Sequence, residues 1–207
     1  MYTLFGYKGS GSAAIELALE RTLQPFRVCQ AASWDPQSAI KELLAINPLG
    51  QIPTLQLHDG TVLTESAAIL IHLGLNHPVS ELLPADAADR AQVIRGLVYL
   101  AANCYAAIGV IDYPERWSTK HDEATLKAIR QGARDRLHHY WDLFADCFWR
   151  EPYLSGPQLG ALDLLAAVVS KWSGARPHIA ASRPHLYKTL QKIEADEAVT
   201  RVFSQHW

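Results

Sequence analysis

The sequence N-P-L-G-Q-I-P-T-L at residues 47–55, followed by L-T-E-S-A-A-I at residues 63–69, decides the fold of this chain. Between the two stretches lies His-Asp-Gly at residues 58–60, and an Asp-Gly pair is a strong signal for a tight β-hairpin. The apolar run that begins at Ser66 predicts a helix over residues 66–77. The segment therefore indicates two strands, at residues 53–57 and 61–63, that lead directly into a helix.

The residues before this segment alternate between strand and helix patterns. Residues 2–7 are aromatic and β-favouring, and residues 26–29 form a second brief apolar run. Residues 13–23 favour a helix, and Asp35-Pro36 is typical of an N-cap with proline at the first position of a helix that extends to residue 46. The expected order is strand, helix, strand, helix, hairpin, helix, which describes a small α/β domain over residues 1–78.

Beyond a linker at residues 78–84, which prolines bracket, every segment has a helical pattern. We therefore expect an all-helical domain over residues 85–207, and both domains fall within the usual size range. The fold class is α/β followed by all-α. The expected helices cover residues 86–111, 122–149, 160–172, 184–195 and 196–205, and Pro114, Pro152, Pro157, Pro177 and Pro184 punctuate them.

Composition and charge exclude several function classes. The chain has 207 residues, 49% of them hydrophobic, and its net charge of -2 provides no basic field for nucleic acid or a membrane surface. Three cysteines form no C-x-x-C pair, and nine histidines show no metal-ligand spacing, so we expect reduced thiols and no metal. The start lacks a signal-peptide pattern, and the apolar run at residues 67–74 is too short to span a bilayer. We predict a soluble, cytoplasmic protein.

The two motifs, in this order and spacing, resemble the glutathione-site signature of the cytosolic glutathione transferases. That signature is N-P-x-G-x-[IV]-P-x-L, then a hairpin, then [TS]-E-S-x-A-I, and every element is present here. The two-domain layout matches along nearly the whole chain and is closest to the bacterial, beta-like classes. The resemblance implies a thioredoxin-like domain that binds glutathione as co-substrate, a C-terminal helical bundle domain, and a homodimer.

The resemblance also implies roles for the motif residues. In the family, Pro53 would be cis and Ile52 would bind the cysteinyl part of glutathione through its backbone, since an exposed backbone edge holds a peptide as an added strand. Glu65 and Ser66, where a helix begins, suit the γ-glutamyl ammonium and carboxylate. Gln51 would contact the glycyl end, where many relatives carry lysine. Taken singly, the Thr-Glu-Ser sequence can equally cap a helix, and the proline can equally begin an edge strand.

The loop after the first strand would supply the group that activates the thiol of glutathione. The pKa of a free thiol is about 8.5, and a hydroxyl that donates to the sulfur lowers it. The beta and omega classes carry cysteine here, but this loop has none, so a mixed disulfide through it is excluded. Ser10 matches the position counted from the start, whereas counting back from residues 18–19 gives Gly11 and then Ser12. Tyr7 and backbone N–H groups are alternatives, and both serines can equally be turn or cap residues.

The helical domain would supply the other wall of the site. Beta-class relatives carry a histidine on the first long helix, and that place falls near Tyr105, with Asn103 just before it. Tyrosine leaves a phenolic donor but no base that titrates near neutrality. Tyr105 and Tyr7 would border the acceptor pocket, although either can instead pack in the core. Asp163 matches the aspartate of the family's S/T-x-x-D capping box, with Gly160 at the cap, and is expected to serve folding.

The function that these features predict is transfer of the glutathione sulfur to a hydrophobic, electrophilic small molecule, as in detoxification. Two alternatives stay open. The same site suits a glutathione-dependent isomerase, dehalogenase or peroxidase, because each uses the same thiolate with another acceptor. A glutathione-binding scaffold without turnover is the third reading, since a fold does not settle a reaction.

Overall fold

The computed structural model describes residues 1–207, and it begins with a four-stranded sheet. The strands are β1 (Tyr2–Gly6), β2 (Phe26–Gln30), β3 (Thr54–Gln56) and β4 (Val62–Leu63). Their order is β2-β1-β3-β4, with β2 parallel to β1 and the β3-β4 hairpin antiparallel to it. The predicted hairpin is confirmed: the Leu57 N–H donates to the Thr61 carbonyl at 2.8 Å around the Asp-Gly turn.

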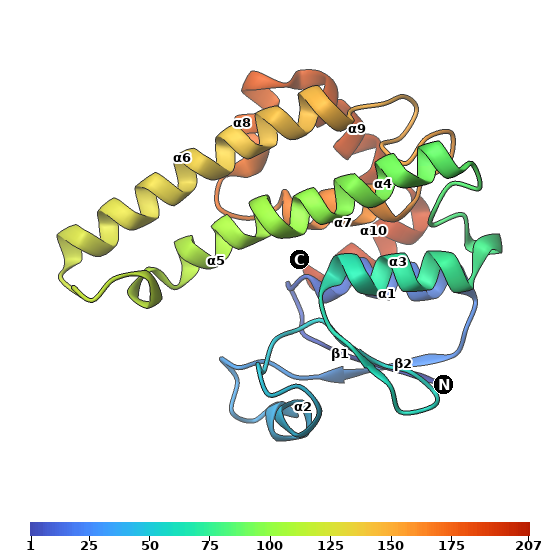
Figure 1. The fold of residues 1–207 in the computed structure, drawn as a ribbon, viewed down its shortest axis with the longest axis horizontal. Coiled ribbons are helices and arrows are strands. Elements are labelled where there is room, and N and C mark those ends of the chain that lie inside the picture. Colours follow the sequence, from blue (N-terminus) through green and yellow to red (C-terminus); the bar gives the residue numbers. More distant parts are fainter.

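Three helices complete this part of the chain. α1 (Ser12–Thr22) and α3 (Ser66–Asn76) cover one face of the sheet, and α2 (Ile40–Ile46) covers the other (Figure 1). The apolar residues of α1 and α3 share a core with Leu4 of β1. A smaller cluster of Phe5, Ala31 and Leu43 lies under α2. This is the predicted thioredoxin-like arrangement.

The predicted helix start at Asp35-Pro36 is wrong. α2 begins only at Ile40, and the Asp35 carboxylate accepts the Gln37 N–H at 2.9 Å and the Tyr7 hydroxyl at 2.7 Å. An aspartate that bonds the backbone two residues on closes a turn in place of a helix. The contact with Tyr7, 28 residues earlier, holds this turn beside the end of β1.

The rest of the chain is helical, as predicted. The segment expected as one helix over 86–111 is α4 (Ala87–Tyr99), the π-helical turn η2 (Leu100–Tyr105) and α5 (Ala106–Asp112) in succession. One helix, α8 (Ala175–Ser182), was not predicted, because it contains Pro177, and proline usually separates helices. Pro177 is the third residue of α8, where the N–H has no partner within the helix and proline is tolerated. The other helices are α6 (Glu123–Phe148), α7 (Ala161–Val169), α9 (Pro184–Glu194) and α10 (Glu197–His206), with the 3-10 turns η1 (Pro78–Ser80) and η3 (Pro114–Trp117).

One hydrophobic core runs through the sheet-bearing and helical parts. α7 lies at its centre, with every residue from Ala161 to Val169 buried, and it packs against α1 and α3 as well as α4 and α9. Because the core is continuous, the division at residues 78–84 stays a prediction. The segment Ala87–Asp112 is long and apolar enough to cross a membrane by length and composition alone, but its apolar side packs on α6 and α7.

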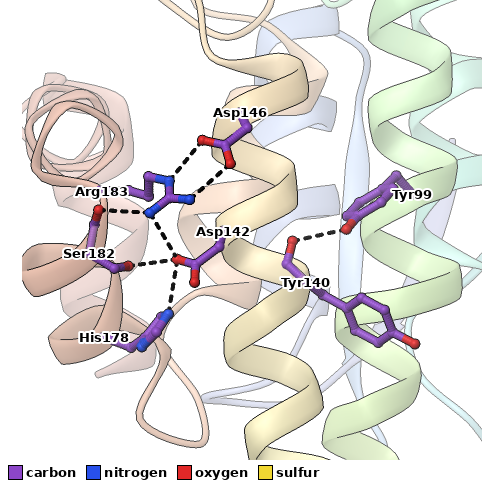
Figure 2. Close-up of polar contacts among 7 residues, drawn as sticks. All are labelled: Tyr99, Tyr140, Asp142, Asp146, His178, Ser182 and Arg183. Atoms are coloured by element: carbon purple, nitrogen blue, oxygen red, sulfur yellow. Dashed lines mark hydrogen bonds and ion pairs between the residues drawn. The ribbon is translucent and has the colours of Figure 1, made fainter.

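Polar bonds tie the long helix α6 to its neighbours (Figure 2). Asp142 accepts from His178 at 3.0 Å and from Ser182 at 2.7 Å, and Arg183 pairs with Asp146 through two bonds of 2.8 Å. On the opposite side of α6, the Tyr99 hydroxyl of α4 donates to the backbone carbonyl of Tyr140 at 2.9 Å. The serine and the histidine both bond the same carboxylate oxygen, so no imidazole is placed to activate the serine hydroxyl. The cluster is a structural link.

Asp163 holds the loop before α7. Its carboxylate is fully buried and accepts three backbone N–H groups, those of Leu154, Ser155 and Gly160, at 2.7 to 3.0 Å. The bond from Gly160 forms half of the capping box. Burial raises the pKa of Asp163, and the three donors oppose that rise. This geometry supports the folding role expected from the sequence.

Asp163→Ala should destabilise the fold by about 3 kcal/mol or more, because each buried N–H that loses its acceptor costs about 1–3 kcal/mol. The matched control is Asp122→Ala, which removes the exposed N-cap of α6 and should cost only about 1 kcal/mol. Urea unfolding followed by circular dichroism measures both. Equal losses in the two variants would contradict a central role for Asp163.

Candidate functional site

A cleft of about 720 Å³ lies between the two parts of the chain. One wall comes from the loop after β1, the segment before β3 and the start of α3, and the other comes from η2, α5, η3 and α7. Seven of the predicted site residues line the cleft: Ser10, Gln51, Ile52, Pro53, Glu65, Ser66 and Tyr105. Tyr7, Ser12 and Asn103 are not among the lining residues.

The segment before β3 offers an open backbone edge to the cleft. The Ile52–Pro53 bond is cis, and neither the N–H nor the C=O of Ile52 has a hydrogen-bond partner in the chain. The residues around it are held firmly, since the Asn47 amide donates to the Gln51 carbonyl at 3.1 Å and to the Thr54 hydroxyl at 2.9 Å. The edge is therefore rigid and unpaired at the same time, which suits the addition of an extended peptide.

The start of α3 presents two unpaired polar groups. Ser66 is buried to 8% exposure, yet its hydroxyl and the Glu65 carboxylate make no bond within the chain; the Gln51 amide, in the segment before β3, is also free. The first N–H groups of a helix carry partial positive charge and suit an anion. Glu65 adopts φ 65° and ψ 113°, a conformation that costs a non-glycine residue about 1–3 kcal/mol. Such local strain is typical of ligand sites.

The two serines of the first loop form a hydrogen-bonded chain. The Tyr7 N–H donates to the Ser12 hydroxyl oxygen at 3.1 Å, and the hydroxyl oxygens of Ser12 and Ser10 lie 2.8 Å apart. Ser12 is only 1% exposed, whereas Ser10 lines the cleft. The Ser12 hydroxyl can donate either to the Tyr7 carbonyl at 3.3 Å or to Ser10, and when it donates to Ser10 the single hydrogen of the Ser10 hydroxyl is free to point into the cleft. The geometry favours Ser10 as the donor to a ligand and Ser12 as its support.

The polar groups of Tyr7 and Asn103 are engaged inside the protein. The Tyr7 hydroxyl donates to Asp35, which raises the pKa of the phenol, and its ring packs edge-on against Trp34. The Asn103 amide donates to the Tyr99 carbonyl at 3.1 Å, a backbone group of the helix that the π turn distorts. Neither polar group is brought to the cleft.

Tyr105 faces the first loop from the helical wall. Its hydroxyl lies so close to Gly11 that a Cβ on that residue would come within 2.5 Å of the oxygen. Burial raises the pKa of Tyr105 to about 12, with a smaller opposing effect from the Gly11 N–H, so the phenol is neutral at physiological pH. Its ring packs edge-on against Trp172 at 5.6 Å between centroids.

The aromatic rim of the cleft was not predicted. Trp34 and Trp117 line it at 56% and 64% exposure, and Trp172 lies deeper. Arg116 also lines it, with its guanidinium 4.0 Å from the centre of the Tyr113 ring and without a carboxylate partner. The signal in the sequence was the aromatic and basic cluster directly after the first long helix. No group of three or more His, Cys, Asp or Glu side chains is placed to hold a metal ion.

Comparison with known proteins identifies the family. Residues 12–75 match the family model described as the glutathione S-transferase N-terminal domain. Over 173 residues the chain is 32% identical to the GST-like protein YncG of Escherichia coli K12. These residues make up 83% of this chain and 82% of that protein. The chain belongs to the glutathione transferase family. A maleylacetoacetate isomerase of Pseudomonas aeruginosa is 29% identical over 153 residues, which is 68% of this chain and 71% of that enzyme.

Solved structures agree with this transferase fold. A glutathione transferase homologue from Sulfitobacter, with bound glutathione, superposes with a TM-score of 0.85 at 25% identity and covers 99% of this chain and 97% of that one. The expected fold class, a thioredoxin-like domain followed by a helical one, is confirmed.

Gly11→Ala should destabilise the protein by roughly 1–3 kcal/mol, because the added Cβ collides with the Tyr105 hydroxyl. Gly11 has φ -62°, so alanine meets no backbone strain there. Tyr105→Phe removes the oxygen, so the double variant should recover at least about 0.5 kcal/mol of the loss.

The control is Gly132→Ala in α6, where an added Cβ meets nothing within 4 Å and should stabilise the helix by about 0.8 kcal/mol. Urea unfolding of the single and double variants measures the coupling. Strictly additive effects of Gly11→Ala and Tyr105→Phe would show that the two residues do not meet.

Proposed function

We propose that this protein is an enzyme that binds glutathione in the cleft and activates its thiol for attack on an apolar, electrophilic small molecule. The observation that carries the proposal is the unpaired backbone of Ile52, which lies in one cleft with the free polar groups of Glu65 and Ser66 and with the Ser10 hydroxyl. The Sulfitobacter homologue, whose structure contains bound glutathione, also supports the proposal.

Each lining residue has a binding role in this proposal. The cysteinyl backbone of glutathione pairs with Ile52 beside Pro53, as an added strand. The γ-glutamyl carboxylate takes the N–H and hydroxyl of Ser66 at the start of α3, and its ammonium pairs with Glu65. Gln51 donates to the glycyl carboxylate as a neutral group, so this bond is weaker than a charged donor would make it.

Thiol activation falls to the first loop. A hydroxyl that donates to sulfur favours the thiolate over the thiol. Ser10 is the donor in the cleft, and Ser12 orients it through the 2.8 Å contact between their hydroxyl oxygens. Tyr105 borders the acceptor from the helical wall as a neutral donor. A substrate-binding role for Tyr7 and Asn103 remains a prediction from the sequence, because their polar groups bond inside the protein.

The aromatic rim is the proposed acceptor pocket. Trp34, Trp117 and Trp172 offer apolar surface, and Arg116 offers a cation without a carboxylate partner. A second candidate, a glutathione-dependent isomerase on the same site, draws support from the similarity to the Pseudomonas isomerase, and an unpaired arginine suits an acceptor that carries a carboxylate. A homodimer, a cytoplasmic location and a part in detoxification stay predictions.

Bound glutathione should ionise well below the free thiol pKa of about 8.5 in the wild-type protein. Ser10→Ala should raise the bound pKa by about 1–2 units, because a hydrogen bond to a charged group contributes about 1.5–3 kcal/mol. Ser12→Ala should raise it less and also destabilise the loop. Ultraviolet thiolate absorbance against pH measures all three, and Ser204→Ala, at an exposed serine of α10, is the control.

The outcomes separate the candidates. Glutathione binding without a lowered pKa in any protein would favour a scaffold over an enzyme. A large effect confined to Ser12→Ala would move the donor role two residues along the chain. Absence of binding would remove the proposal.

A further inference from the structure

The side chain of His206, far along the chain in α10, reaches the first loop of the sheet part. Its Nδ1 accepts the backbone N–H of Gly9 at 3.3 Å, and its Nε2 lies 3.0 Å from a carboxylate oxygen of Glu16 in α1. The His206 side chain is only 7% exposed. Gly9 has no other hydrogen-bond partner for its N–H, so His206 alone satisfies it.

These two contacts fix the tautomer of the ring. A nitrogen that accepts from an N–H carries a lone pair, so the ring hydrogen sits on Nε2 and is donated to Glu16. Glu16 thus orients the imidazole with its Nδ1 lone pair toward Gly9. The side chain of Glu16 is itself only 14% exposed, which protects this arrangement from water.

The backbone of the loop fits closely against α10. Gly9 has φ +71°, a left-handed conformation that glycine adopts without strain. A Cβ at this position would lie 3.7 Å from the carbonyl oxygen of His206, so the two segments pack in van der Waals contact. The Ser10 N–H returns to the Tyr7 carbonyl at 3.2 Å and closes a tight turn. Because this turn is short, the placement of the Gly9 N–H constrains the direction of the Ser10 side chain.

We propose that His206 is a positioning residue for Ser10: through Gly9 it holds the loop that aims the serine hydroxyl into the cleft. This inference rests on the proposed function, in which Ser10 contacts the glutathione sulfur. It assigns to α10, which does not line the cleft, a part in setting the thiol pKa. His206 itself contacts neither glutathione nor the acceptor in this proposal.

The chain offers a matched control for a purely structural role. Arg201, on the same helix, pairs with Glu20 of α1 at 2.6 Å. This contact joins the same two helices as His206 and Glu16 but does not reach the loop. Arg201→Ala therefore removes a polar link between α10 and α1 while leaving the Gly9 bond intact.

The experiment compares the wild type with His206→Ala, His206→Asn and Arg201→Ala. Asparagine is the conservative variant, because its side-chain oxygen can accept from Gly9 at the place of Nδ1. The first readout is hydrogen exchange of the Gly9 amide by NMR, which needs no glutathione. The second is the thiol pKa of bound glutathione, with kcat and KM for a chromogenic electrophile, and urea unfolding reports overall stability.

His206→Ala should speed Gly9 exchange about fivefold and lower kcat about fivefold, the equivalent of one ordinary hydrogen bond, and should raise the bound thiol pKa. KM for glutathione should change little, since Ile52, Glu65 and Ser66 hold the peptide. His206→Asn should recover most of each effect, and Arg201→Ala should show none. If His206→Ala and Arg201→Ala behave alike in both readouts, His206 is only a packing contact and the inference is wrong.

Failure of the proposed function is distinguishable from failure of this inference. If the wild-type protein binds glutathione without lowering its thiol pKa, the thiolate mechanism is wrong and so is the catalytic part of the inference. If the pKa is lowered in the wild type and Gly9 exchange is unchanged in His206→Ala, the transferase mechanism stands and the loop contact does not.

Discussion

The packing of α1 between two layers is the constraint on which the rest of the structure depends. The helix lies on the sheet with one side and against α7 and α10 with the other, so Ala13, Ala14, Ile15, Leu17, Ala18 and Leu19 are all within about 1% of complete burial. Interiors this closely packed resist displacement. Because α1 starts at Ser12, its burial also fixes the loop from Tyr7 to Gly11. Any side chain of that loop that contacts a ligand is therefore anchored to the rigid core.

Unpaired polar groups gather along one wall of the cleft. Buried polar groups cost free energy unless they are bonded, and a buried and a half-buried carboxylate outside the cleft are well bonded: Asp163 accepts three N–H groups and Asp142 accepts two side chains. Four single buried side-chain atoms, on Arg21, His138, Trp141 and Ser155, lack a partner, but they are scattered over the molecule. In the cleft, by contrast, the backbone of Ile52 and the side chains of Glu65 and Ser66 stay free, while Asn47 braces the segment. Several free groups on one wall of a single cleft can all bond the same ligand, whereas the isolated unpaired atoms elsewhere cannot.

The sequence predicted what is local and missed what is distant. The hairpin and the motif from Gln51 to Ser66 lie within a short stretch, where turn residues and periodicity carry the information. The turn at Asp35 is held by Tyr7, and the Gly9 N–H is bonded by His206, 197 residues away. No local sequence pattern predicts either contact. In the first loop the sequence leaves Ser10 and Ser12 as alternatives. Side-chain direction separated the roles, because only Ser10 of the two serines reaches the cleft.

Gly11 and Tyr105 together explain how this site departs from the beta-like pattern that it resembles. A tyrosine extends further than the histidine of those relatives, and here its hydroxyl occupies the space where any side chain at residue 11 would begin. Burial raises the pKa of Tyr105 to about 12, so the phenol is neutral and, in the proposed function, serves as a hydrogen-bond donor. In the proposed function Ser10 is likewise a donor, so hydrogen-bond donors on both walls would favour a bound thiolate by stabilising its charge.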